Sequence, residues 1–342
     1  MTDARRYREL GVSSSKTALA SALTSCYGGV RPGAFCRIMP GGMVLHSDGT
    51  GTKALLTDLG NPQEVRALAQ DAIVMNTDDM ACVGITGGFV INTVINRNPR
   101  VVDDAAVAAL IAAVEERCAR LRALGIDIVS GGGETADVPE MVTRFTLDMS
   151  AVGRVPQNKI IDNAEVRAGD VIVGLASYGQ ATYEEQENSG VGCNGLTWLR
   201  HDLLPRCPES RPLLVSPTRT FLPVLREVLN DEAVIVRGMV HITGGGHCKT
   251  CKAVPHLRVV KDHTLPVPEV FRMMADVPGV SAREMYQVFN MGCLMEVIVP
   301  EESAAAVIAR AARYGVEAQV TGRFVQGSGM SIVTPYGTFE YE

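Results

Sequence analysis

Two short segments in the first quarter of the chain carry residue types suited to binding a phosphate and a divalent cation. Asp48-Gly-Thr-Gly-Thr-Lys53 follows the apolar Met43–Leu45. Its glycines allow the backbone to approach a ligand closely, Lys53 supplies positive charge, and Asp48 can hold a metal ion. A β-turn with a solvated lysine is the competing interpretation, and two glycines flanking a threonine make it the weaker one.

The second segment, residues 70–79, places three aspartates in an apolar helical pattern. Asp71 and Asp78 are seven residues apart and therefore share a helix face. Asp78 and Asp79 are adjacent like charges, which repel unless a cation or a helix end compensates them. Capping of a helix end explains one of these aspartates but not all three.

Glycine triplets recur in both halves of the chain. Gly131-Gly-Gly-Glu134-Thr-Ala-Asp137 follows a short apolar run at 126–129, and we expect a loop whose successive N–H groups bind phosphate. His241-Ile-Thr-Gly-Gly-Gly246 is a second such turn without a carboxylate, so a simple strand corner is more credible there. Oxygen ligands beside phosphate-binding glycines suit Mg²⁺ rather than a soft metal. The residue chemistry therefore predicts a nucleoside triphosphate bound with Mg²⁺.

Composition excludes several other classes of protein. The 342 residues include 32 Lys and Arg against 38 Asp and Glu, a net charge of −6 with no long basic block, so we expect no nucleic-acid partner. No apolar stretch reaches 18 residues and the N-terminus does not resemble a signal peptide, so we expect no membrane partner. Nine scattered cysteines are typical of reduced thiols in a cytoplasmic protein. The Gly190–Gly195 GxGxxG lacks a preceding strand, which argues against a dinucleotide site.

The elements that must position these motifs alternate between helix and strand in both halves. Apolar periodicity predicts helices at 63–80, 104–124, 196–204, 218–230, 267–274, 281–289 and 302–314, and a short one near 16–24. Strands are expected at 89–95, 126–129, 145–152, 171–175, 294–299 and 317–322, with a hairpin near 335–337. The pattern indicates an α/β (α+β) fold with two domains, 1–165 and 166–342.

Six motifs, in order, resemble phosphoribosylformylglycinamidine cyclo-ligase, also called aminoimidazole ribonucleotide (AIR) synthetase. Asp48–Lys53 is similar to its DGVGTK segment, 71–79 to D-x₃-M-x₂-ND, and 132–137 to GGETAE. Ser216–Arg219 is similar to APTR, 241–246 to HLTGGG, and 284–292 to EMYxxFNxG. Together they span the chain from about residue 45 to the last strand, and six ordered motifs are highly specific.

The resemblance implies a two-domain AIR synthetase-like fold whose N-terminal strands form a barrel across a homodimer, with ATP and Mg²⁺ in a nearby cleft. It implies ring closure of formylglycinamidine ribonucleotide, a small-molecule substrate, in purine biosynthesis. ATP phosphorylates the amide oxygen, which then leaves as phosphate when the neighbouring nitrogen attacks. Such chemistry asks the protein mainly for positioning and charge neutralisation.

Carried over by position, the resemblance assigns three roles. Asp48, Asp79 and Glu134 would bind Mg²⁺, so Glu134→Gln should lower Mg²⁺-dependent turnover far more than stability. The catalytic set would be Lys53, which contacts phosphate, together with Asp71 and His241. The remaining nucleotide- and substrate-side residues are Gly49, Thr50, Gly51, Thr52, Gly132, Gly133, Thr135, Asp137, Thr218, Arg219, Thr243, Gly244, Gly245, Gly246 and Asn290.

Three departures from the family pattern are visible. The HSNG segment maps onto Gly192-Cys-Asn-Gly195, so its histidine is missing. The loop at 179–191 is longer than usual and rich in glutamate. A Cys248-x-x-Cys251 pair follows the second glycine triplet, and two thiols without a metal or redox role are favoured over a zinc or redox site. Residues 1–40 map onto no family motif.

Other functions remain open at this point. A small-molecule kinase similar to thiamine-monophosphate kinase would share the Mg²⁺–ATP half, but the APTR-like and FNxG-like segments favour the ligase. Selenophosphate synthetase would need a reactive cysteine in a convincing glycine-rich context, which Cys26 and Cys36 lack. The missing histidine also keeps a non-catalytic nucleotide-binding relative under consideration.

Overall fold

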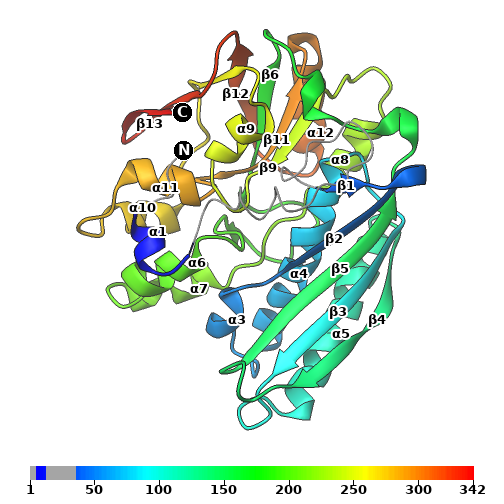
Figure 1. Cartoon of the computed structure of the whole chain (residues 1–342), viewed down its shortest axis with the longest axis vertical. Coiled ribbons are helices and arrows are strands. Elements are labelled where there is room, and N and C mark those ends of the chain that lie inside the picture. Colours follow the sequence, from blue (N-terminus) through cyan, green and yellow to red (C-terminus); the bar gives the residue numbers. More distant parts are fainter. Residues whose placement is uncertain (1–4, 13–35) are drawn as a thin grey trace.

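Two mixed sheets organise the chain in the computed structural model, which describes residues 5–12 and 36–342 (Figure 1). The N-terminal sheet has the order β1-β2-β5-β3-β4, in which only β3 and β4 are parallel. Its strands are β1 (Arg37–Ile38), β2 (Met43–Gly49), β3 (Phe89–Arg97), β4 (Ile128–Asp137) and β5 (Phe145–Arg154).

Helices α4 (Pro62–Ala81) and α5 (Asp104–Ala123) cover one face of this sheet, behind the strands in Figure 1. Each begins at a side-chain cap: Asn61 accepts from the amide of Gln63 at 3.0 Å, and Asp103 accepts from that of Ala106 at 2.8 Å. Strand alternation turns Ile91 and Ile95 toward the helices and leaves Val90 outside. The opposite face of the sheet therefore stays open to solvent in a single chain.

The C-terminal sheet has seven strands in the order β14-β13-β10-β12-β6-β11-β9, with β10 and β13 as its one parallel pair. These are β6 (Val171–Ala176), β9 (Gly238–His241), β10 (Arg258–Lys261), β11 (Cys293–Val299), β12 (Ala318–Val325), β13 (Met330–Thr334) and β14 (Gly337–Tyr341). The helices of this half are α8 (Leu222–Asn230), α9 (Cys248–Ala253), α10 (Glu269–Ala275), α11 (Ala282–Val288) and α12 (Glu301–Arg313). Helix α12 packs on β6, β11 and β12.

Shorter elements complete the described chain. They are α1 (Arg5–Glu9), α3 (Lys53–Leu56), α6 (Leu196–Trp198), which continues as a π-helical turn at Leu199–Leu203, α7 (Arg211–Leu214), the hairpin strands β7 (Tyr178–Gly179) and β8 (Asn188–Ser189), and 3-10 turns at Pro40–Gly42, Gln157–Lys159, Asn163–Glu165 and Pro208–Ser210. None of the helices in the described ranges is long and apolar enough to cross a membrane.

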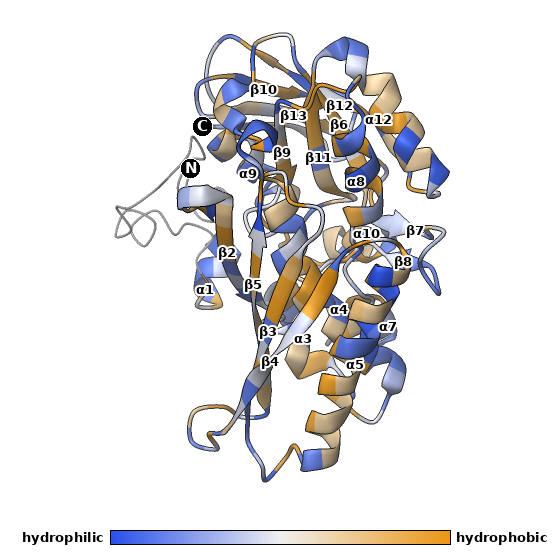
Figure 2. Ribbon diagram, turned by 90° about the vertical axis from the view of Figure 1, so that its right-hand side faces the viewer, coloured by the Kyte–Doolittle hydropathy of each residue, from blue (hydrophilic) through white to orange (hydrophobic). Residues whose placement is uncertain are grey.

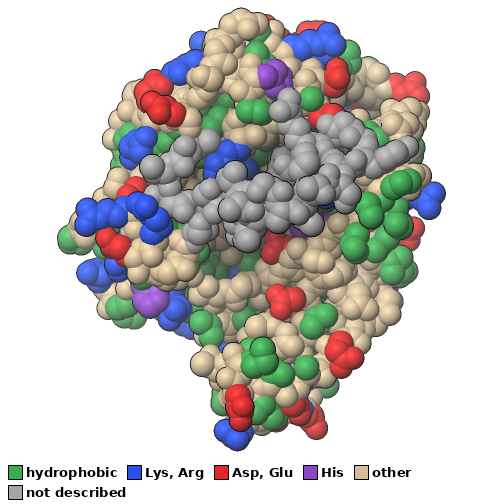
Figure 3. All heavy atoms as spheres, in the orientation of Figure 1, with side chains coloured by type: hydrophobic (Ala, Val, Ile, Leu, Met, Phe, Trp, Pro, Cys, Tyr) green, Lys and Arg blue, Asp and Glu red, His purple; other side chains and the backbone are tan. Residues whose placement is uncertain are grey.

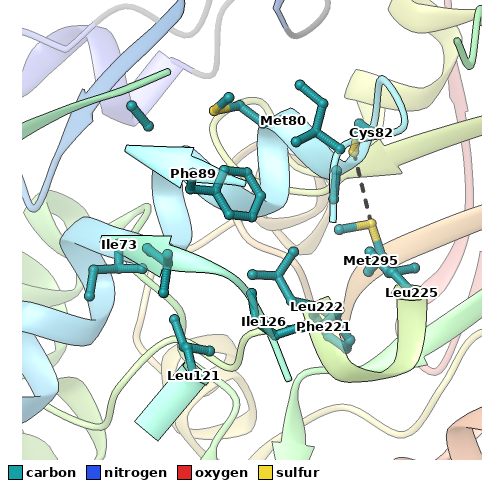
Figure 4. Packing of buried hydrophobic residues seen from close by; sticks show 14 of the residues in the cluster. Ile73, Met80, Cys82, Phe89, Leu121, Ile126, Phe221, Leu222, Leu225 and Met295 are labelled. Atoms are coloured by element: carbon teal, nitrogen blue, oxygen red, sulfur yellow. Dashed lines mark hydrogen bonds between the residues drawn. The ribbon is translucent and has the colours of Figure 1, made fainter. Parts of the chain in front are cut away.

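One hydrophobic cluster joins the two halves. It includes Ile73 and Met80 from α4 together with Phe221, Leu222 and Leu225 at and within α8 (Figure 4). The thiol of Cys82, just after α4, lies 4.0 Å from the sulfur of Met295 on β11. In Figure 2, hydrophobic residues, coloured orange, lie on strands of both the N-terminal and the C-terminal sheet. Burial of this shared surface fixes α4 against the second half, so residues from both halves can build one site.

The α/β fold class is confirmed, and most of the expected helices and strands are present. Two expectations are wrong. Gly131–Asp137 is part of β4 and not a loop, since residues 133–137 pair in parallel with β3 and Gly131 and Gly132 form an irregularity in the register. Residues 216–221 are not helical, so α8 begins only at Leu222. The short helix expected at 16–24 lies outside the described residues. The domain boundary at 165 stays a prediction, and it falls between the last strand of one sheet and the first of the other.

Candidate active site at the junction of the two halves

The centre of the candidate site is Asp79, near the end of α4. Its Oδ1 lies 2.8 Å from Nδ1 of His241, at the end of β9, and its Oδ2 lies 3.5 Å from Nε2 of His46 on β2. The ammonium group of Lys249 lies 4.0 Å from Oδ1. Burial by itself would raise the pKa of Asp79, but Lys249 and His241 more than offset this and hold it well below its usual range. Asp79 is therefore a carboxylate at neutral pH.

Asp48 lies beside this group, at the end of β2. Because side chains alternate along a strand and Asp48 is four residues from the buried Val44, both side chains face the helix side of the sheet. Asn76 of α4 fixes the strand end by donating to the carbonyl of Asp48 at 3.2 Å and by contacting His46 Nδ1 at 3.1 Å. The side chain is exposed at the surface, but the protein atoms packed around it partly desolvate the carboxylate. This desolvation, together with the charge of Asp79, raises the pKa of Asp48.

His241 presents one ring nitrogen without a partner. The side chain is fully buried, its Nδ1 is bound to Asp79, and its Nε2 has no hydrogen-bond partner among the described residues. Because an unpaired buried nitrogen costs free energy, such an atom indicates a ligand position. The glycine turn 244–246 follows directly, with positive φ at all three residues. A Cβ on Gly246 would lie 2.5 Å from the carbonyl oxygen of Tyr286, so glycine is required there.

Asp71 and Lys53, both in the predicted catalytic set, form a buried ion pair with each other. The Lys53 ammonium lies 2.8 Å from Asp71 Oδ2 and also donates to the carbonyls of Gly192 (3.2 Å) and Ser216. All three of its hydrogens are thereby used. Asp71 Oδ1 also accepts from the amide (2.7 Å) and hydroxyl (2.5 Å) of Thr218. The pair joins the two halves of the chain, and the catalytic roles of Lys53 and Asp71 stay predictions.

Arg219 and Asn290 are likewise structural rather than part of an open cleft. The fully buried Arg219 donates to three backbone carbonyls in 176–179 and pairs with Glu184 at 2.5 Å. Asn290 donates to the carbonyls of Gly190 and Val191 and accepts from Ser177 and Gly292. Their hydrogen-bonding groups are occupied by the protein itself, so the nucleotide- or substrate-side roles predicted for them are not supported.

Glu134 does not join Asp48 and Asp79 within one chain. It lies on β4, three strands from β2, on the order of 14 Å away at ordinary strand spacing. It pairs with Val94, whose neighbours Thr93 and Ile95 face the helices, so Glu134 points to the opposite, outer face. Gly132, Gly133, Thr135 and Asp137 share that strand, and Asp137 pairs with Arg97 at 2.7 Å. The predicted three-carboxylate metal site is therefore not assembled by a single chain, and no group of three or more metal-ligating side chains occurs in 5–12 and 36–342.

Two family models cover most of this chain. Residues 33–155 match "AIR synthase related protein, N-terminal domain", and residues 167–334 match its C-terminal counterpart. Phosphoribosylformylglycinamidine cyclo-ligase of Methanocaldococcus jannaschii is 31% identical over 300 residues, which cover 83% of this chain and 78% of that protein. The chain belongs to the AIR synthase-related family. A ligase of the same name from Thermococcus gammatolerans is 30% identical, with 85% of this chain and 81% of that protein covered.

Solved structures agree on the fold of this family. The protein tt0281 from Thermus thermophilus has a TM-score of 0.62 at 18% identity, covering 92% of this chain and 95% of that chain. HypE from E. coli, a hydrogenase maturation protein, has a TM-score of 0.62 at 15% identity, covering 96% and 90%. At such identities the likeness shows the fold alone.

The family segment that lacks its histidine keeps its place in the structure. Gly192 stands where the family has the histidine, and the thiol of the next residue, Cys193, lies 3.4 Å from the carbonyl oxygen of Thr50. Thr52 contacts Thr197 through their hydroxyls at 2.7 Å. Gly195 remains necessary, since a Cβ would lie 2.3 Å from the Phe289 ring. The segment therefore still supports the Thr50–Lys53 turn, and burial raises the pKa of the Cys193 thiol, which keeps it protonated.

Sequence reasoning missed His46, Asn76 and Lys249. The first two lie within or beside the motifs, and only the packing of β2 on α4 shows that they face Asp79. Sequence reasoning also missed a buried pair in the second half, Lys261 with Glu296 at 2.5 Å, which sits beneath the glycine turn. Cys248 and Cys251 lie buried on α9, and the thiol of Cys251 donates to the carbonyl of Cys248 at 3.2 Å. The absence of a metal or redox role for this pair stays a prediction.

Proposed function

We propose that this chain closes the imidazole ring of formylglycinamidine ribonucleotide at the expense of ATP, giving aminoimidazole ribonucleotide, ADP and phosphate. Transfer of the γ-phosphoryl group to the amide oxygen converts a poor leaving group into phosphate. Attack by the neighbouring nitrogen then forms the ring and expels it. The protein's task is to orient two anionic substrates and neutralise their charge.

The observation that carries this proposal is the cluster around Asp79. An ionised, buried carboxylate, a second carboxylate at Asp48 and the unpartnered Nε2 of His241 meet at one junction, in a chain of the AIR synthase-related family. Lys249 supplies a cation at the same place.

These residues fit Mg²⁺ carried by a nucleotide. Mg²⁺ is commonly held by one or two carboxylates, with phosphate oxygens and water completing its shell, so a pre-formed cage of three ligands is not required. Asp48 and Asp79 would hold the ion, which neutralises phosphate charge when bound. His241, oriented by Asp79, would donate from Nε2 or accept at it, according to its protonation. The thiamine-monophosphate kinase of Aquifex aeolicus shares the fold, with a TM-score of 0.55, so a kinase is the alternative that the assay must exclude.

We also propose that the outer face of the N-terminal sheet pairs with a second copy. Leu45, Val90 and Val129 are 45–57% exposed on these strands. This face points toward the viewer in Figure 3, where hydrophobic side chains lie exposed over the lower half. An apolar sheet face open to water is typical of an oligomer interface. Leu45→Glu together with Val90→Glu should convert a dimer to a monomer in light scattering, and a monomeric wild-type protein would contradict the pairing.

The function is tested by incubating the protein with formylglycinamidine ribonucleotide, ATP and Mg²⁺. We expect aminoimidazole ribonucleotide, detected by diazo coupling, and ADP in equal amounts. ADP formed without ring closure would indicate a kinase or an ATPase. Absence of nucleotide binding in calorimetry would indicate a non-catalytic relative.

A further inference from the structure

A cavity of about 430 Å³ lies between α4, α5 and the segment 183–188, on the helix side of the N-terminal sheet. Figure 2 shows β7 and β8, which flank this segment, close to α4 and α5. None of the residues that line the cavity belongs to the candidate active site. The segment is the glutamate-rich part of the loop at 179–191, for which the proposed reaction gives no use.

Three arginines line the cavity: Arg66 from α4, and Arg117 and Arg120 from α5. Arg117 is only 8% exposed, and its Nε has no hydrogen-bond partner among the described residues. A guanidinium group withdrawn from water with an unused donor is costly unless a ligand completes it. Arginine forks are well suited to bind phosphate.

Glu185 at present supplies the negative charge opposite these arginines. Its carboxylate contacts Arg120 through an ion pair and lies 3.6 Å from Arg117. Glu116 contacts Arg117 at 2.9 Å and lies 3.8 Å from Arg66. Glu185 sits on a surface segment with half of its side chain exposed, so a stronger anion can displace it at small cost.

Glu184, the neighbouring carboxylate, is not available to neutralise the cavity. It forms a buried pair with Arg219 and accepts from the amide of Ala181 at 2.7 Å. The segment is thus anchored at Glu184 while Glu185 remains free to move away.

The remaining walls combine apolar side chains with amide side chains from α4 and from the segment 183–188. Ala67, Ile73, Val74 and Leu121 come from the two helices, and Pro217 closes the cavity from the second half. A volume of this size accommodates a small organic ligand. The arginines therefore select an anionic group at one side, and the apolar walls select a ring at the other.

We propose that this cavity is a second binding site, for a small organic phosphate that carries a heterocyclic ring, as in a nucleoside monophosphate. The phosphate displaces Glu185 from Arg117 and Arg120, and the ring packs between α4 and α5. No bond is made or broken. The ligand's source is either the ribonucleotide substrate or a separate effector, and both share this chemistry.

The site communicates with the aspartates of α4 through one short segment. Tyr183, in the cavity wall, donates its hydroxyl to the carbonyl of Thr220 at 2.7 Å. The hydroxyl of Thr220 lies 3.1 Å from Asp78, the neighbour of Asp79. Binding in the cavity can therefore be sensed at the candidate active site.

Titration calorimetry of the full chain with inosine monophosphate tests the proposal, with inosine as the probe that lacks phosphate. We expect saturable binding of the monophosphate and at least tenfold weaker binding of inosine. Arg117→Met and Arg120→Met should each weaken binding about tenfold, because each removes a charge-assisted contact. Glu185→Gln should tighten it severalfold, because the competing carboxylate is lost. Arg258→Met, which removes an arginine of β10 paired with Glu340 of β14, neither of which lines the cavity, is the matched control and should change nothing.

The opposite signs of the Arg117 and Glu185 variants separate binding from folding, since a variant that merely unfolds cannot bind more tightly. Formylglycinamidine ribonucleotide added to the complex distinguishes the two sources. Displacement of inosine monophosphate identifies the substrate's own phosphate site, whereas binding of both identifies an effector site. Absence of monophosphate binding to wild type, or equal binding by wild type, Arg117→Met and Glu185→Gln, would overturn the proposal.

Discussion

Helix α4 carries three aspartates, and the fold places two of them against the second half of the chain and the third beside a candidate ligand position. Asp71 and Asp78 face segment 216–221 of the second half, and protein donors occupy both: Lys53 and Thr218 for the first, Thr220 and the amide of Phe221 for the second. Asp79, one residue further, faces two histidines and a lysine at an edge where His241 has an unpartnered nitrogen. Asp71 and Asp78 hold the two halves together, whereas Asp79 is positioned for a ligand.

The pKa values of these two adjacent aspartates thus shift in opposite directions. Burial raises the pKa of Asp78 to about 6, although His241 and the Phe221 amide oppose the rise. The surroundings of Asp79 hold its pKa well below its usual range. A motif that contains both aspartates therefore does not by itself indicate which one acts on a ligand, and the four experiments below test this division.

The largest effect is expected from Lys53→Met. Removing the ammonium group leaves Asp71 charged and unpaired in the interior, which costs about 3–5 kcal/mol of unfolding free energy. Urea denaturation followed by fluorescence or circular dichroism measures it. Lys159→Met removes an exposed lysine of the same half and is the control, with an expected change within about 0.5 kcal/mol. A Lys53→Met protein that is as stable as wild type but binds ATP more weakly would show that Lys53 contacts phosphate, as the motif predicts.

Asp78 should give stability a specific pH dependence. Its folded pKa of about 6 lies above the usual 3.8, so the folded state keeps a proton that the unfolded state releases. Below pH 4 both states are protonated and the favourable contribution is fully present; as the pH rises through 6 it is lost, on the order of 3 kcal/mol. The unfolding free energy of wild type minus that of Asp78→Asn, measured in EDTA, should therefore fall between pH 4 and 6.5. A constant difference would show that Asp78 is ionised in the folded state.

Periodicity was sufficient to predict α4, α5, α12 and most strands, because each buries one regular apolar face. It failed at β4, where a glycine triplet suggests a loop. The neighbouring strand β3 pairs with residues on both sides of Gly131 and Gly132, which form an irregularity within β4 rather than a loop. Such long-range pairing overrides local preference, and a single sequence does not reveal it.

The sequence motifs predicted only some of the residues that meet at the candidate site. Asp48, Asp79 and His241 come together as the motifs suggest. Lys53 and Arg219 are the charged residues of those motifs. Each forms a buried ion pair with a residue distant in sequence, a structural contact that the motifs do not indicate. His46 and Lys249 lack a motif signal and join the site only through the packing of β2, α4 and the turn after β9.

Asp79→Asn should lower turnover about 100-fold, because the variant loses the negative charge that orients His241 and that, in the proposed function, holds Mg²⁺. Stability should fall as well, because the groups that hold the pKa of Asp79 low stabilise its charge in the folded state. Turnover is therefore compared at a temperature where circular dichroism shows both proteins to be folded. The steady-state rate of ADP release with saturating substrates measures the effect, and Asp103→Asn, which preserves a helix cap, is the control. Wild-type turnover by Asp79→Asn would place the chemistry elsewhere.

The smallest effect is expected from Glu134→Gln, contrary to the expectation from the motif alone. Glu134 is exposed on the outer face of β4, three strands from Asp48, so a single chain gives it no contact with the Asp79 cluster. Turnover should fall at most about threefold and the unfolding free energy should stay within about 0.5 kcal/mol. The decisive measurement is the Mg²⁺ dependence of turnover in wild type, Glu134→Gln and the dimer-breaking Leu45→Glu/Val90→Glu protein. A large rise in the Mg²⁺ concentration needed by Glu134→Gln, reproduced when the dimer is broken, would mean that Glu134 reaches the site of the partner subunit across the outer face of the sheet. The division along α4 would then describe only half of the metal site, with the other half supplied by a second copy.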